Sequence, residues 1–133
     1  MLDDDAEAGR RLAAVTRLQA DYSRFVDDRD GEALAGLYAA GGALVLGDRE
    51  IGGERELAAF AAGGPRAVHS QGVPSIRLRP DGDIDAVSSF TVVVADTGAI
   101  LAGRYTDRMT WEDGRLLFAR RHVDIRIARR DAG

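Results

Sequence analysis

The sequence predicts an α+β fold in which helices form the N-terminal half and antiparallel strands form the C-terminal half. The first observation is that apolar residues recur at three- and four-residue intervals in the segments before Pro65. The second is that the chain after Pro65 consists of long strand-like segments separated by Asp/Gly turns. A chain of 133 residues has the size of one domain, so we expect a single domain over residues 1–133.

The first predicted helix covers residues 6–28 and is amphipathic. Its apolar residues lie on one stripe: Leu12, Val15, Leu18, Tyr22, Phe25 and Val26. A second stripe of small residues runs beside it and ends at Asp27, whereas Asp28 extends the charged stripe. Asp30 is expected to cap the next helix. Of these three aspartates, Asp27 is therefore the one with room for a partner side chain.

Three further elements are predicted before Pro65. A short helix begins at Asp30 or Gly31 and is expected to end at Gly41 and Gly42. Residues 43–47 form a short apolar strand, and residues 47–53 form a turn or a brief hairpin. A third helix covers residues 54–64 and is stopped by two glycines and the proline.

Four strands are predicted after Pro65, over residues 67–80, 83–96, 99–111 and 115–128. The three turns that connect these strands have the Asp/Gly composition of hairpin turns. Helices followed by a run of antiparallel strands indicate a sheet that wraps around a helical layer.

The register of the last hairpin depends on the length of its turn. A two-residue turn at Asp113 would mix apolar and charged side chains on each face, whereas a three-residue turn over residues 112–114 separates them. The second choice pairs Tyr105 with Arg121 and places Asp107 on the same apolar face, with His122 and Phe118 on the other. Because burying an uncompensated charge is costly, these polar groups are expected either to pair with one another or to line a polar pocket.

Composition excludes several classes of function. The chain has no cysteine and only two histidines, His69 and His122, so disulfides, thiolate chemistry and a histidine-rich metal site are not expected. The arginines are scattered and the net charge is −4, which argues against a nucleic-acid partner. No segment has the length and apolar character of a membrane span or a secretory signal, so we expect a cytoplasmic protein without a membrane partner.

Several stretches together resemble the SnoaL-like branch of the nuclear transport factor 2 superfamily. They are "LQADYSRFVDDRDGEALAGLY", "AVHSQG" and "LAGRYTDRMTWEDGRLLFARRHV", and the resemblance covers nearly all of residues 8–128. This branch includes scytalone dehydratase, bile acid 7α-dehydratase, hexachlorocyclohexane dehydrochlorinase and polyketide cyclases. The resemblance implies a cone-shaped, cystatin-like α+β barrel, with a curved antiparallel sheet around the first helices, an internal pocket and a homodimer.

The resemblance also implies a set of site residues. His69 matches the family's histidine base, and Asp27 matches the aspartate that orients it. Tyr22 and Arg121 match further catalytic positions, and the pocket is expected to be lined by Tyr105, Val26, Leu101 and Val123. The region over residues 88–96 offers no second histidine, so a scytalone dehydratase-type site is not supported.

The sequence therefore favours a cofactor-independent lyase, such as a dehydratase, or an isomerase or cyclase. Its substrate is expected to be a small, largely apolar, oxygenated molecule, with His69 as general base and no metal or cofactor. One alternative left open is a non-catalytic ligand-binding or dimerisation module of the same fold. A less favoured alternative is an epoxide hydrolase, which needs a second carboxylate beside Arg121.

Overall fold

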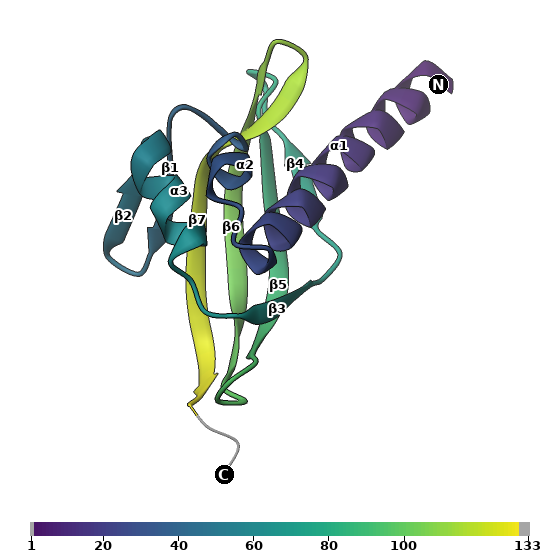
Figure 1. Ribbon diagram of the computed structural model, residues 1–133. Helices are drawn as coiled ribbons and strands as arrows, with labels where there is room; N and C mark the ends of the chain where they lie inside the picture. The colour runs from purple at the N-terminus through teal and green to yellow at the C-terminus, as the bar shows by residue number, and fades with distance from the viewer. Residues whose placement is uncertain (1, 131–133) are drawn as a thin grey trace.

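A computed structural model describes residues 2–130, with side chains from residue 4 (Figure 1). Helices α1 (Leu2–Asp27), α2 (Gly31–Ala35) and α3 (Glu54–Ala62) lie on one side of a curved sheet. The strands are β1 (Tyr38–Leu46), β2 (Arg49–Gly52), β3 (Ala67–Gln71), β4 (Ser75–Leu78), β5 (Ile84–Val94), β6 (Ile100–Glu112) and β7 (Arg115–Arg129). The predicted α+β class is confirmed. None of the described helices has the length and apolar character needed to cross a membrane.

The sheet has the strand order β2-β1-β7-β6-β5-β3, and β4 also pairs with β5. Neighbouring strands are antiparallel except β1 and β7, which are parallel. The sheet is open, because β2 and β3 at its two ends do not pair with each other. The segment predicted as one strand over residues 67–80 is divided into β3 and β4 by Gly72, Val73 and Pro74.

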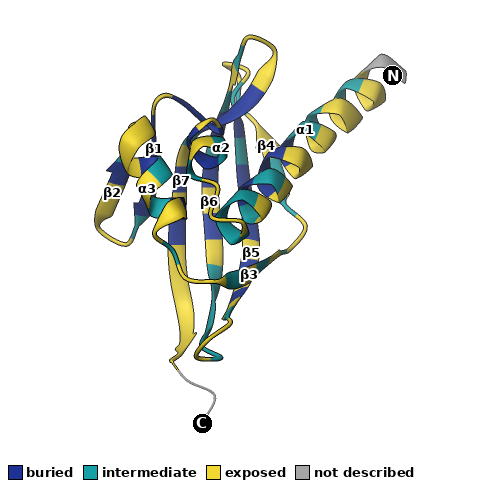
Figure 2. Ribbon diagram, in the orientation of Figure 1, coloured by how far each residue is buried: buried dark blue, intermediate teal, exposed yellow. Residues whose placement is uncertain are grey.

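The buried part of α1 begins at Val15, where the helix meets the sheet. Figure 1 shows the N-terminal turns of α1 projecting beyond the sheet, and Figure 2 shows that these turns are exposed. Leu12 lies on the predicted apolar stripe but is 47% exposed for this reason. Further along the helix, Leu18 and Tyr22 are buried against the inner face of the sheet. The core therefore lies between the three helices and the inner face of the sheet.

Helix α2 is shorter than predicted. Asp30 Oδ1 accepts a hydrogen bond from the backbone of Ala33 at 3.1 Å, which confirms the predicted cap. The helix ends at Ala35, however, and the two glycines predicted to end it lie inside β1. Gly41 has a φ of +75°, and a Cβ on Gly42 would lie 2.7 Å from the carbonyl oxygen of Phe118. These glycines therefore form an irregular part of β1 that approaches β7 closely.

The predicted three-residue turn between β6 and β7 is wrong. Asp113 and Gly114 have φ values of 53° and 76°, as a two-residue turn of type I′ requires, and Glu112 pairs with Arg115. A register shift follows between the pairs Met109–Phe118 and Arg108–Arg120, which leaves Ala119 as an extra residue in β7. The conformational preference of the Asp-Gly turn therefore determines the start of the hairpin, and a β-bulge then corrects the register.

The bulge has two consequences for the inner face. Asp107, and not Tyr105 as predicted, pairs directly with Arg121. Both are buried on the same face as Tyr105, and that shared face is what the alternation of polarity predicts. Phe118 was predicted on the opposite face but is fully buried in the core, because it precedes the extra residue. Two aromatic rings and an ion pair are thereby brought to one side of the hairpin.

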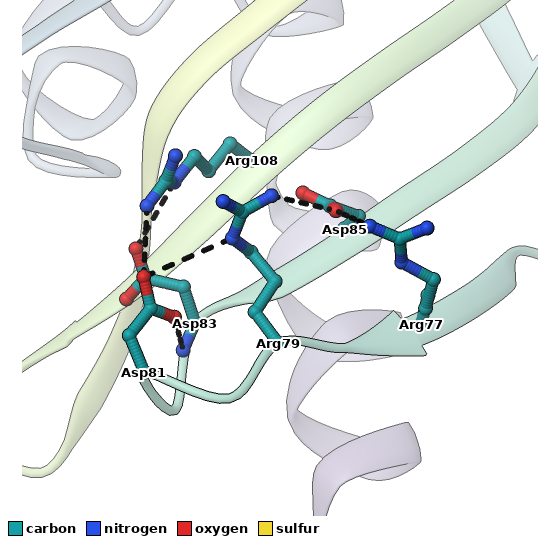
Figure 3. Close-up of polar contacts among 6 residues, drawn as sticks. All are labelled: Arg77, Arg79, Asp81, Asp83, Asp85 and Arg108. Carbon is teal, nitrogen blue, oxygen red and sulfur yellow. Dashed lines mark hydrogen bonds and ion pairs between the residues drawn. The ribbon is translucent and has the colours of Figure 1, made fainter.

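The outer surface carries a separate cluster of charges around the turn between β4 and β5 (Figure 3). Arg108 of β6 contacts Asp81 and Asp83, each at 3.1 Å, and Arg79 contacts Asp85 at 3.1 Å. Between a fifth and a half of each of these side chains remains accessible to solvent. This cluster connects the turn to the neighbouring strand, and its charged groups remain partly hydrated.

Candidate functional site

Asp27 and His69 meet where the C-terminal end of α1 crosses β3. Asp27 Oδ1 lies 2.6 Å from His69 Nδ1, and its two carboxylate oxygens accept hydrogen bonds of 3.1 and 3.0 Å from the backbone N–H of His69. The side chains are 22% and 13% exposed respectively. A carboxylate at a helix C-terminus faces the negative end of the helix dipole, so these three contacts offset an unfavourable position. The structure therefore brings together the two residues that the sequence proposes as a pair.

The contact with Asp27 determines which ring nitrogen of His69 can act. Nδ1 is occupied by the carboxylate, so a neutral imidazole carries its proton there and leaves Nε2 as the proton acceptor. His69 is on the side of β3 that faces α1, and its ring lies edge-on to Tyr22 with 6.5 Å between ring centroids. The acceptor nitrogen thus belongs to a side chain at the margin of the aromatic core.

Arg121 lies at the centre of that core and is completely buried. Its guanidinium carbon is 3.5 Å from the ring centroid of Tyr105, 4.2 Å from that of Tyr22 and 4.7 Å from that of Phe118. Contacts of this kind between a cation and aromatic faces are favourable, above all when water is excluded. Three rings from α1, β6 and β7 therefore enclose one positive charge.

The ionic partner of Arg121 is Asp107, which is also buried. Arg121 Nε lies 3.1 Å from Asp107 Oδ1, but the angle is not that of a hydrogen bond. The two terminal guanidinium nitrogens, Nη1 and Nη2, also lack a hydrogen-bond partner among the described residues. Buried polar atoms without partners are uncommon because losing water is costly. These nitrogens therefore keep a capacity for hydrogen bonding that the described residues do not use.

Burial raises the pKa of Asp107 to about 6, although the nearby Arg121 charge and a hydrogen bond from Gln19 act in the opposite direction. Gln19 Nε2 donates over 3.5 Å to Asp107 Oδ2 and over 3.3 Å to Ser88 Oγ. Gln71 Nε2 donates to the same serine oxygen at 3.2 Å. A chain of polar groups thus leads from β3 through α1 and β5 to the buried ion pair.

Tyr22 lies between the two parts of the site. Its ring contacts Tyr105 edge-on at a centroid distance of 5.7 Å, and the residue is almost completely buried. Burial raises the pKa of Tyr22 to about 12, and the pKa of Tyr105 rises well above its usual value for the same reason. Both phenols therefore stay protonated at neutral pH, so they are available as hydrogen-bond donors.

The other residues that the resemblance assigns to the pocket lie in or beside this core. Val123 is buried in it, and Val26 and Leu101 are partly buried against it. His122 is exposed on the outer face and accepts a hydrogen bond from Arg120 at 3.1 Å. Within residues 2–130, no three His, Cys, Asp or Glu residues are grouped closely enough to hold a metal ion.

Sequence reasoning missed the polar chain of Gln19, Ser88 and Gln71. A signal was present, because Gln19 lies four residues after Val15 and three before Tyr22, on the buried stripe of α1. Ser88 likewise alternates with the buried Ala86 and Phe90. A polar residue at a position where the period requires an apolar one is the pattern that would have identified both.

The sequence profile of the SnoaL-like domain family matches residues 10–122. The chain belongs to the SnoaL-like domain family. A comparison with curated protein sequences gave no significant match.

Solved structures similar to this SnoaL-like chain cover most of its length. A protein of unknown function from Mycobacterium tuberculosis is 23% identical over 91% of this chain and 75% of its own, with a TM-score of 0.83. A candidate scytalone dehydratase from Novosphingobium aromaticivorans is 20% identical over 100% of this chain and 93% of its own, with a TM-score of 0.83. A hexachlorocyclohexane dehydrochlorinase, LinA-type3 from Novosphingobium barchaimii, is 17% identical over 98% and 95%, with a TM-score of 0.82. At these identities, the likeness establishes the shared fold.

Proposed function

We propose that this SnoaL-like protein is a cofactor-independent lyase, isomerase or cyclase that removes a proton from a small, largely apolar, oxygenated substrate. The observation that carries the proposal is the 2.6 Å contact between Asp27 Oδ1 and His69 Nδ1. The carboxylate orients the ring and stabilises the imidazolium that forms when Nε2 accepts a proton. His69 is the proposed base, and Asp27 is the proposed orienting group.

Arg121 is the proposed group that stabilises negative charge. Removing a proton next to a carbonyl group, or next to a carbon with a leaving group, builds negative charge elsewhere on the substrate. The terminal nitrogens of Arg121 are buried without hydrogen-bond partners among the described residues, so they are preorganised donors for such an oxygen. Tyr22, protonated at neutral pH, is the proposed donor to a departing oxygen. Two relatives named as a candidate dehydratase and a dehydrochlorinase support an elimination reaction.

The test is exchange of carbon-bound hydrogen into a panel of cyclic ketones in D₂O, measured by mass spectrometry. General acid–base catalysis contributes ~100- to 10,000-fold, so His69→Ala is expected to lower the exchange rate by about that factor. His122→Ala is the matched control, because this second histidine is exposed on the outer face, and it should exchange at the wild-type rate. Wild-type exchange by His69→Ala would eliminate His69 as the base.

The tautomer of His69 provides a test that needs no substrate. The ¹⁵N NMR shifts of its ring are expected to show a protonated Nδ1 and a bare Nε2, because Asp27 accepts from Nδ1. Asp27→Asn should remove that preference. If the tautomer is the same in the two proteins, Asp27 does not orient the ring, and a non-catalytic binding module becomes the better description.

An epoxide hydrolase is the second candidate, favoured by one observation. Asp107 supplies the carboxylate beside Arg121 that such a site needs, at 3.1 Å. The described contacts of Asp27 are to His69 rather than to Arg121, so this candidate ranks below proton abstraction. The two are separated by adding cyclic epoxides to the panel, since only a hydrolase converts them to diols.

A further inference from the structure

A groove of about 300 Å³ lies between α1 and the loop that joins β3 to β4. Its walls include Leu12 and Thr16 of α1 and Val73 of the loop, and they are mainly apolar. Leu12 is 47% exposed and Val73 is 91% exposed, so an apolar ligand in the groove would cover surface that water now contacts. Ligand sites commonly have volumes of roughly 300 to 1,000 Å³, so the groove fits a small ligand.

The groove also contains one amide whose hydrogen bonding is incomplete. Gln19 and Gln71 both line it, and both donate to Ser88 Oγ. Gln71 Oε1, however, is buried and has no hydrogen-bond partner among the described residues. A buried acceptor without a donor lowers the stability of the native state unless something donates to it. A ligand that carries a hydroxyl group would supply the missing donor.

The groove leads toward the proposed base along the line where α1 crosses β3. Gln71 and His69 are two residues apart on the same face of β3, a separation of about 6.6 Å along a strand. On α1, Ser23 lies between Ala20, which lines the groove, and Asp27. Ser23 Oγ is also buried, and no described residue forms a hydrogen bond with it. Two such polar atoms, Gln71 Oε1 and Ser23 Oγ, therefore lie between the groove and the Asp27–His69 pair.

We propose that this groove binds the hydroxyl-bearing end of the substrate, and that Gln71 selects apolar alcohols by accepting a hydrogen bond from their hydroxyl group. The inference rests on the proposed function for the reaction that follows, and it extends that function to a substrate class. The apolar part of the alcohol contacts the apolar walls, and the hydroxyl group donates to Gln71 Oε1. The reacting carbon then lies several bonds from the hydroxyl group, in the direction of His69.

The test is an NMR titration of the wild-type protein with cyclohexanol and with methoxycyclohexane, which has the same ring but no donor. Cyclohexanol is expected to shift the side-chain amide signal of Gln71 and the methyl signals of Leu12 and Val73. It should bind about 5-fold more tightly than the ether, as one net hydrogen bond predicts. Equal affinities for the two probes, or shifts confined to another surface, would overturn the proposal.

Three variants sharpen the test. Gln71→Met keeps the size of the side chain and should remove the preference for the alcohol, whereas Ala20→Phe should fill the groove and abolish binding of both probes. Ser70→Ala is the matched control, because this neighbouring polar residue is exposed on the opposite face of β3. If Gln71→Met retains the preference, or if Ala20→Phe binds like the wild type, the groove is not the site.

Binding is measured without turnover, so the two proposals fail separately. If the wild type prefers the alcohol but the His69→Ala variant exchanges deuterium at the wild-type rate, the groove proposal stands and the proposal that His69 is the base fails. If exchange depends on His69 but the wild type binds the alcohol and the ether equally, the proposal that His69 is the base stands and the groove proposal fails.

Discussion

The protein contains two arginine–aspartate clusters that use the same chemistry in opposite surroundings. On the outer surface, Arg108 contacts Asp81 and Asp83 at 3.1 Å (Figure 3), and about two fifths of its side chain is exposed. In the core, Arg121 lies 3.1 Å from Asp107, and neither side chain is exposed. The distances are equal, so the difference between the clusters is their access to water.

That difference decides what each cluster contributes. The surface charges keep much of their hydration, so their pairing adds little stability and weakens in salt. The buried charges lose their hydration. Arg121 recovers one ionic contact and three aromatic contacts, but its terminal nitrogens donate no hydrogen bond to any described residue. An apolar pair of the same volume is often at least as stable as a buried ion pair. Stability alone therefore does not explain the buried cluster, and the proposed function gives Arg121 a second role.

The largest expected effect comes from breaking the buried cluster. Arg121→Ala leaves Asp107 buried without a partner and should lower the free energy of unfolding by about 3–5 kcal/mol, measured by urea denaturation. Replacing both residues, as Arg121→Met with Asp107→Leu, should restore most of that loss while abolishing the deuterium exchange. A double variant as unstable as the single one would show instead that the pair is mainly structural.

An intermediate effect is expected in the pH dependence of stability. Burial raises the pKa of Asp107 from 3.8 to about 6, so the native state binds a proton more tightly than the unfolded state. The contribution of this group is therefore fully present below pH 3.8 and is lost as the pH rises through about 6. Asp107→Asn lacks this titration and keeps the shape of the side chain.

Thermal unfolding of the two proteins across this pH range isolates the effect. The melting temperature of the wild type, relative to that of Asp107→Asn, should fall as the pH increases. The exposed carboxylates titrate in both proteins, so their contribution cancels in the comparison. A constant difference between the two proteins would mean that burial does not dominate the environment of Asp107.

The smallest effect is expected in the surface cluster. Arg108→Ala should change the free energy of unfolding by at most about 1 kcal/mol, because the pairs that it breaks are partly solvated. The change should shrink further in 1 M salt, where the screening length is about 3 Å. The loss of unfolding free energy caused by Arg121→Ala should stay the same in salt, because the wild-type guanidinium is buried and dissolved ions do not contact it. Equal salt sensitivity of the two variants would remove the distinction between the clusters.

The sequence alone determined the order of the elements and much of the candidate site. The period of α1 separated Asp27 from Asp28 and Asp30, and the family resemblance selected His69 as its partner. Alternation along β6 and β7 placed Tyr105, Asp107 and Arg121 on an inner face, although the polarity pattern paired Arg121 with Tyr105 and not with Asp107. The helical period and the strand alternation depend on local spacing, which a sequence displays directly. The choice of His69 depends on the resemblance instead.

Only the tertiary structure decided the register of the final hairpin beyond its turn and the side chains that contact Arg121. β7 pairs with β6 on one side and with β1 on the other, and the backbone of Phe118 donates to the carbonyl oxygen of Leu37 at 2.8 Å. Register shifts occur in both pairings near this residue. Where a strand must satisfy two neighbours and a tight turn at once, a bulge reconciles them, and no single segment of sequence specifies its position. The two-residue turn set Phe118 opposite the buried Met109, and the bulge then set Asp107 opposite Arg121.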